Sequence, residues 1–219
     1  MQINCQKFCF NPFYQNTYLL YRNREALLID AGMSTASEEK AVEDFLRQNQ
    51  LHLTHVLVTH AHLDHVFGLP FLFLHHGLRP YMHPIDEATL QMVPQYAPLY
   101  NSHFSTPEGM LPPHYLSAPG TISWSGLQIE VLFLPGHAPG HVGFVIHEMQ
   151  AVFSGDVLFR NSIGRTDLPG ANEQTLLTSI TQTLYQLPDH YAVFTGHGNN
   201  TTIGEEKANN PFTQHYEKQ

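Results

Sequence analysis

The segment Thr59-His60-Ala61-His62-Leu63-Asp64-His65 constrains this chain most, because it places three imidazoles and one carboxylate within six residues. It directly follows the apolar run 53–58, which has the character of a buried strand. Neutral imidazole and carboxylate groups are ligands for zinc, iron and manganese. Buried without a cation, four such groups would be destabilised by desolvation and mutual repulsion. A solvated histidine-rich loop is the alternative in a chain with 16 histidines, but the spacing favours a metal site.

Three further candidate ligands each follow a segment with strand character. The segments 127–134, 151–153 and 191–194 are apolar or alternating, and they precede His137, Asp156 and His197 respectively. If these strands share an orientation, the loops that follow them open on one edge of a sheet. Sheet proteins commonly place their sites at such an edge. The sequence therefore predicts that these three side chains lie close together.

The order of these motifs resembles that of the metallo-β-lactamase superfamily over nearly the whole chain. The pieces are His-x-His-x-Asp-His at 60–65, Pro-Gly-His-Ala-Pro-Gly-His at 135–141, Ser-Gly-Asp at 154–156 and Thr-Gly-His-Gly at 195–198. The resemblance implies an α+β fold, an αββα sandwich of two mixed β-sheets with helices on the outer faces. Because no linker is evident, we expect residues 1–219 to form a single domain of this kind.

The resemblance also implies a dinuclear metal centre. Its ligands would be His60, His62 and His137 for the first ion, Asp64, His65 and His197 for the second, and Asp156 as the bridge. The cofactor would be two divalent ions, zinc in the first place, with iron or manganese as alternatives. Such a pair generates hydroxide at neutral pH and polarises a carbonyl group, so hydrolysis of an activated acyl bond is expected. Asp64 is also the candidate catalytic residue, because its carboxylate could orient the attacking water.

Two longer segments narrow the resemblance. Residues 153–159 and 158–170, together with 201–211, look like the short bacterial relatives of glyoxalase II, the hydroxyacylglutathione hydrolases. This implies a thioesterase that acts on small hydroxyacyl-glutathione-type thioesters through a metal-bridging hydroxide. The motif Gly-Arg-Thr-Asp at 164–167 also resembles persulfide dioxygenases, which use one iron, and a lactonase is a further alternative. A non-enzymatic metal scaffold is disfavoured, because acidic ligands suit a hydrolytic pair better than a storage site.

Composition excludes several other functions. The formal charge is −9, from 10 Lys and Arg against 19 Asp and Glu, and without a basic cluster we expect no nucleic-acid partner. No run of 18 apolar residues is present, so no membrane span is expected. Residues 1–7 do not resemble a signal peptide.

Cys5 and Cys9 are too far apart within one strand to pair, and a cytoplasmic location is expected. The oligomeric state is not decided by the sequence.

Several other elements can be placed along the chain. We expect a β-meander over 2–30, a helix over 34–48, and helices over 64–76 and 171–187, the last with Asn172 as its N-cap. Residues 80–120 contain eight prolines. We expect a helix over 84–93 there and then a long irregular excursion, which either covers the site or only packs on the body.

We interpret two further motif residues, His141 and Arg165, as supports for the loops that carry the candidate ligands. His141 would hold the loop of His137 without binding a metal itself, and a purely structural histidine is the alternative. Arg165 would brace the loop after Asp156 by pairing with Asp167, in preference to a contact with substrate.

Overall fold

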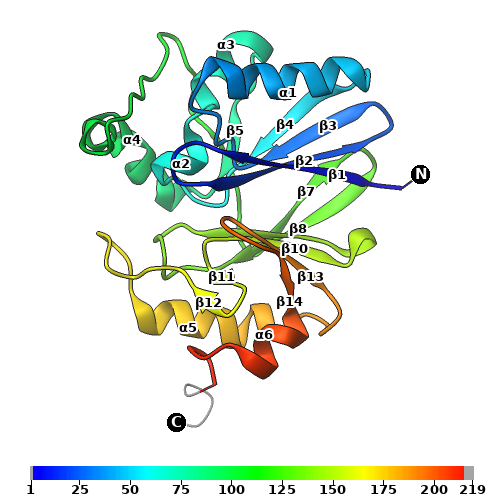
Figure 1. Cartoon of the computed structure of the whole chain (residues 1–219), viewed down its shortest axis with the longest axis vertical. Coiled ribbons are helices and arrows are strands. Elements are labelled where there is room, and N and C mark those ends of the chain that lie inside the picture. Colours follow the sequence, from blue (N-terminus) through cyan, green and yellow to red (C-terminus); the bar gives the residue numbers. More distant parts are fainter. Residues whose placement is uncertain (1, 215–219) are drawn as a thin grey trace. The chain divides into compact units, whose positions relative to one another are not determined.

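The computed structural model describes residues 2–214 and divides the chain into two compact units, residues 1–116 and 117–219. Each unit contains one six-stranded mixed sheet with helices (Figure 1). The boundary falls at the end of the proline-rich segment. The α+β class and the two mixed sheets are as expected from the sequence, while the single domain over 1–219 stays a prediction.

The sheet of the first unit has the strand order β1-β2-β3-β4-β5-β6. Its strands are β1 (Asn4–Phe10), β2 (Gln15–Arg22), β3 (Glu25–Ile29), β4 (His52–Leu57), β5 (Pro80–Met82) and β6 (His114–Tyr115). β1 to β3 form the expected antiparallel meander, and β3 to β6 run parallel to one another. The parallel strands β3 and β4 therefore end at the same edge of the sheet, which places residues 30 and 58–60 side by side.

The described part of this unit has four helices, and the first of them packs on the sheet. They are α1 (Ala36–Gln48), α2 (Leu63–Val66), α3 (Leu69–His76) and α4 (Glu87–Tyr96), with 3₁₀ turns η1 (Pro84–Asp86) and η2 (Ala97–Tyr100). Thr35 and Glu38 form a capping box that starts α1. Val42 and Leu46 of α1 join a core with Leu19, Leu28 and Val56 from the sheet.

The sheet of the second unit has the order β14-β13-β10-β9-β8-β7. Its strands are β7 (Gly120–Trp124), β8 (Leu127–Phe133), β9 (Val142–Ile146), β10 (Ala151–Gly155), β13 (Ala192–Thr195) and β14 (Thr201–Thr202). A separate hairpin consists of β11 (Leu158–Phe159) and β12 (Ser162–Ile163). The helices α5 (Glu173–Gln182) and α6 (Ile203–Asn209) lie on one face of the sheet, with 3₁₀ turns η3 (His147–Met149) and η4 (Leu184–Gln186) (Figure 1).

Two helix predictions were wrong in extent. The expected helix over 64–76 is broken into α2 and α3, because Gly68 donates its N–H to the Ala31 carbonyl at 2.7 Å and packs on Met33. The expected helix over 171–187 ends at Gln182. Thr183 at its C-cap has φ −121° and ψ −64°, and the chain continues as the 3₁₀ turn η4.

Other local predictions are confirmed. Asn172 caps α5 by accepting the Thr175 N–H at 2.8 Å. In the proline-rich segment, the helix expected over 84–93 is found as η1 and α4, and residues 101–113 contain no helix or strand. Whether this excursion covers the site stays a prediction.

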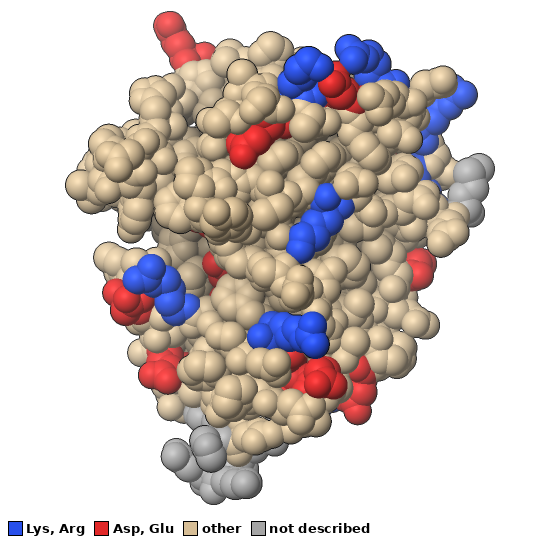
Figure 2. Space-filling view, viewed as in Figure 1, with Lys and Arg blue, Asp and Glu red and all other residues tan. Residues whose placement is uncertain are grey.

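The described residues contain no helix that is long and apolar enough to cross a membrane. On the face drawn in Figure 2, Lys and Arg side chains are scattered and several adjoin Asp or Glu.

We expect the thiols of the two cysteines to differ in their reactivity toward alkylating reagents. Both lie on β1 as free thiols, Cys5 partly buried and Cys9 exposed. Burial raises the pKa of Cys5 to about 12, so its reactive thiolate becomes abundant only near that pH. At pH 8, we expect iodoacetamide to modify Cys9 first and Cys5 far more slowly, as peptide mass spectrometry would show. Equal rates for the two cysteines in the folded protein would contradict this expectation, and unfolding in urea should equalise them.

Candidate metal centre

Four of the predicted ligands form one cluster in the first unit, the His60–His65 cluster, made of His60, His62, Asp64 and His65. The ring centroid of His60 lies 4.6 Å from that of His62 and 4.1 Å from that of His65. The Asp64 Oδ2 atom lies 3.6 Å from His65 Nε2. His60 and His65 are buried. The loop after β4 and the short helix α2 thus turn four potential ligands toward one another.

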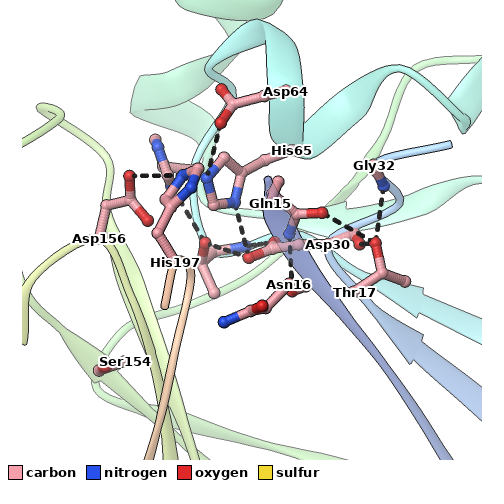
Figure 3. A network of polar contacts seen from close by, with 12 residues as sticks. Gln15, Asn16, Thr17, Asp30, Gly32, Asp64, His65, Ser154, Asp156 and His197 are labelled. Atoms are coloured by element: carbon pink, nitrogen blue, oxygen red, sulfur yellow. Dashed lines mark hydrogen bonds and ion pairs between the residues drawn. The ribbon is translucent and has the colours of Figure 1, made fainter. Parts of the chain in front are cut away.

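Asp30, the residue after β3, orients two of these histidines (Figure 3). Its Oδ2 atom accepts the His65 Nδ1–H at 2.9 Å and the Thr59 hydroxyl at 2.8 Å, and its Oδ1 accepts the Thr59 N–H at 2.7 Å. Because that hydroxyl gives its only hydrogen to Asp30, it must accept from His60 Nδ1, 3.1 Å away. Both imidazoles therefore carry hydrogen on Nδ1, which leaves Nε2 with its lone pair available for a metal.

Two more side chains hold the backbone of this cluster. Asp86, buried in η1, accepts the Ala61 N–H at 2.7 Å. Asn11 donates from Nδ2 to the carbonyl oxygens of Gly32 at 2.9 Å and Asp64 at 3.0 Å. The ligand-bearing segment is thus fixed from two separate elements, which favours a rigid site.

The other three predicted ligands form a second cluster, the His137–Asp156–His197 cluster, in the second unit. β8 and β10 are both antiparallel to β9, and β10 is parallel to β13. β8, β10 and β13 therefore share an orientation, as required for their loops to meet at one edge. The Asp156 Oδ2 atom lies 3.7 Å from His137 Nε2 and 3.4 Å from His197 Nε2. Figure 3 shows Asp156 pointing from β10 beside His197.

The supporting residues of this cluster act partly as expected. His137 Nδ1 donates to the Arg165 carbonyl at 2.9 Å, which again leaves Nε2 as the lone-pair atom. The side chain of His141 accepts the Asp156 N–H at 3.1 Å, and its carbonyl accepts the Leu134 N–H at 2.9 Å. His141 thus closes the loop of His137, as predicted, and in addition positions Asp156.

The Arg165 side chain takes no part in orienting His137. It donates from Nε and Nη2 to the two carboxylate oxygens of Asp167, at 2.6 and 2.7 Å, and both side chains are largely exposed. These hydrogen bonds lower the pKa of Asp167 to about 2. Arg165 therefore supports His137 through its backbone, while its guanidinium group shapes the loop.

The donor atoms in both clusters fit a bound cation. In the second, His137 Nε2 lies 3.7 Å from a carboxylate oxygen of Asp156, and an imidazole with its hydrogen on Nδ1 offers a metal the lone pair of this Nε2 atom. In the first, the Nε2 atoms of His60 and His65 are left as acceptors by the same logic. Each of the seven predicted ligands belongs to a group of His and Asp side chains that could hold a metal ion.

Sequence reasoning did not identify Asp30 or Asp86. The sequence does contain a pattern that could identify Asp30, because this residue follows a buried strand that pairs with the strand leading to His60. No such pattern identifies Asp86, since it begins a helix in an irregular segment and bonds to a backbone atom 25 residues away.

The sequence-family model of the metallo-β-lactamase superfamily matches residues 10–197 of this chain, a range that includes both clusters. The chain belongs to the metallo-β-lactamase superfamily. As a member of this superfamily it has the expected fold, and the metallo-β-lactamase fold implies a pair of divalent metal ions.

Three proteins similar to this chain carry names that describe different activities or metal contents. The hydroxyacylglutathione hydrolase GloC of Haemophilus influenzae is 37% identical over 215 residues, which cover 96% of this chain and 98% of that protein. The crystal structure of the BLEG-1 B3 metallo-β-lactamase is 31% identical with a TM-score of 0.87, covering 96% and 99% of the two chains. The crystal structure of TTHA1623 in a di-iron-bound form is 36% identical with a TM-score of 0.84, covering 94% and 99%.

Proposed function

We propose that this protein is a metal-dependent thioesterase that hydrolyses small hydroxyacyl thioesters of the hydroxyacylglutathione type. The observation that carries the proposal is the geometry of the two clusters, in which imidazole Nε2 atoms lie 3.4, 3.6 and 3.7 Å from carboxylate oxygens. The similarity to the GloC hydrolase over nearly the full length of both chains supports the choice of substrate class.

In this proposal, all seven residues serve as ligands of two divalent ions. His60, His62 and His137 would hold one ion, Asp64, His65 and His197 would hold the other, and Asp156 would be shared by the two sets. Zinc suits such mixed imidazole and carboxylate sets, and iron suits them too. A bound metal pair would supply Lewis-acid chemistry, since it polarises an acyl carbonyl and lowers the pKa of coordinated water.

The residues of the chain supply positioning and proton handling. The Asp30 carboxylate fixes the tautomers of His60 and His65, and the Arg165 carbonyl does the same for His137. The Asp64 carboxylate accepts a proton from the attacking water, which adds to the thioester carbonyl. The C–S bond then breaks and releases a thiolate. A thiolate leaves readily without prior protonation, so no dedicated acid is required at the sulfur atom.

We expect protein purified anaerobically to contain two metal ions per chain by elemental analysis and to release thiol from S-lactoylglutathione. Removal of the metal by a chelator should abolish turnover, and added zinc or iron should restore it. The same preparation is tested with a homoserine lactone, a chromogenic cephalosporin and glutathione persulfide. Oxygen consumption with the persulfide by a protein containing one iron, without thioester turnover, would replace the proposal with a dioxygenase. Turnover of only the lactone or only the cephalosporin would replace the substrate class.

A further inference from the structure

A buried carboxylate outside both clusters has no assigned role. Glu206 in α6 is fully buried. Its Oε1 atom accepts the Thr201 hydroxyl at 2.6 Å, and its Oε2 atom accepts the Asn161 N–H at 2.9 Å and the Asn210 Nδ2 at 2.8 Å. Burying a charge is costly, and apolar replacements of buried ionic groups are often neutral or stabilising. Stability alone is therefore a poor reason for a glutamate at this position.

The contacts of Glu206 converge on the turn of the β11–β12 hairpin. Asn161 lies in this turn with a positive φ of 57°, and its N–H points to Glu206. On the other side of the turn, the Ser162 carbonyl accepts the Asn210 Nδ2 at 3.0 Å. Asn210 is itself fully buried. Glu206 and Asn210 thus hold an N–H and a carbonyl group of the same turn.

The hairpin lies next to two candidate ligands, Asp156 and His137. It begins just after Asp156 and ends at Gly164, whose N–H donates to the Val157 carbonyl at 3.3 Å. A Cβ atom on Gly164 would clash with the Asp156 carbonyl oxygen and would lie 3.1 Å from His137 Nδ1. The next residue, Arg165, supplies the carbonyl that orients His137. The backbone at 164–165 thus passes so close to both ligands that a small shift of the hairpin would move them.

We propose that Glu206, together with Asn210, positions the hairpin so that the Arg165 carbonyl holds His137 in its metal-binding tautomer and orientation. This inference rests on the proposed function, because it assigns His137 as a metal ligand. The carboxylate fits this position because its Oε2 atom accepts two N–H donors at once, from the turn and from Asn210, while its Oε1 atom meets the Thr201 hydroxyl. The pair acts through the hairpin and touches neither substrate nor metal.

The test compares Glu206→Met with two matched controls. Glu206→Met keeps the length of the side chain and removes both carboxylate oxygens, so the Asn161 N–H and the Asn210 amide lose their acceptor and the turn should shift. Glu205→Met changes the adjacent exposed glutamate of the same helix. Thr201→Val removes a hydrogen bond to Glu206 Oε1 without touching the hairpin contacts of Oε2. Thr201→Val should therefore lower the melting temperature and leave the metal site unchanged, which separates stability from positioning.

The first measurement uses metal-free protein. The Nδ1–H of His137 is detected by ¹H–¹⁵N NMR of the imidazole groups, assigned with His137→Gln. We expect it in the wild type and both controls, and we expect Glu206→Met to lose it or to exchange it rapidly with solvent. The second measurement titrates Co²⁺ by absorption. Substitutions of residues that orient metal ligands typically weaken binding by about 10- to 100-fold, and we expect a loss in this range only in Glu206→Met.

Wild-type Co²⁺ affinity together with an unchanged His137 signal in Glu206→Met would overturn the proposal, even if its melting temperature falls. If Glu206→Met does not fold, Asn210→Ser takes its place, since it removes the contact with the Ser162 carbonyl. If the wild type itself binds no Co²⁺, the proposed function fails. The NMR comparison still decides whether Glu206 positions His137.

Discussion

Replacement of Asp156 by alanine is expected to abolish the second cluster as a metal site. Its Oδ2 atom is the carboxylate oxygen that faces both His137 Nε2 and His197 Nε2. Without it, two imidazoles remain with no anion to offset the charge of a cation pair. We expect Asp156→Ala to lose at least one metal ion. Thioester turnover should fall by roughly 10³-fold or more, because single electrostatic and acid–base contributions are each worth about 10²–10⁴.

The same variant should remain folded. Asp156 accounts for little apolar packing, and its backbone N–H still donates to His141. Metal content by elemental analysis and turnover at saturating zinc are compared with those of Asp189→Ala. Asp189 is an exposed aspartate of the same unit that pairs with Lys207, and exposed pairs contribute little to stability. Two tightly bound metals in Asp156→Ala would show that Asp156 is not the bridging ligand.

The candidate ligands could be found from the sequence because each follows a strand, and strands show clearly in apolar patterns. The supporting residues could not be found in this way. Asp30 and Thr59 are 29 positions apart and become neighbours only through the parallel pairing of β3 with β4. Arg165 acts through its carbonyl oxygen, which its residue type does not reveal.

The extents of helices were harder to predict for a related reason. The apolar residues between 64 and 76 favour one helix, but the backbone contact between Gly68 and Ala31 divides it. A contact between distant segments thus overrides the local propensity. The same holds for Glu206, whose exposed neighbour Glu205 looks equivalent in the sequence. Burial distinguishes the two, together with the contacts of Glu206 with Thr201, Asn210 and the turn of the β11–β12 hairpin.

Asp64 presents a choice between two roles that its structural position now separates. As the N-cap of the following helix, it would be replaceable by asparagine. The helix α2 begins at Leu63 with His62 at the N-cap position, so Asp64 lies inside the first turn and is not the cap. Its Oδ2 atom lies 3.6 Å from His65 Nε2, and its side chain is 16% exposed. This partly open carboxylate beside the buried histidines suits contact with both a metal and a water molecule.

We therefore expect Asp64→Asn, measured with excess metal, to reduce kcat by about 10²–10⁴-fold, the usual range for a positioned acid–base group. The amide keeps the size of the side chain but cannot accept the proton of the attacking water. KM should change less, because substrate binding depends on other groups. The matched control is Glu39→Gln, which removes a carboxylate from the first turn of α1, where it adds only about 0.3–1 kcal/mol through the helix dipole. Both variants should show similar small changes in melting temperature. Near-normal kcat in metal-loaded Asp64→Asn would remove Asp64 from the chemistry and leave it at most a ligand.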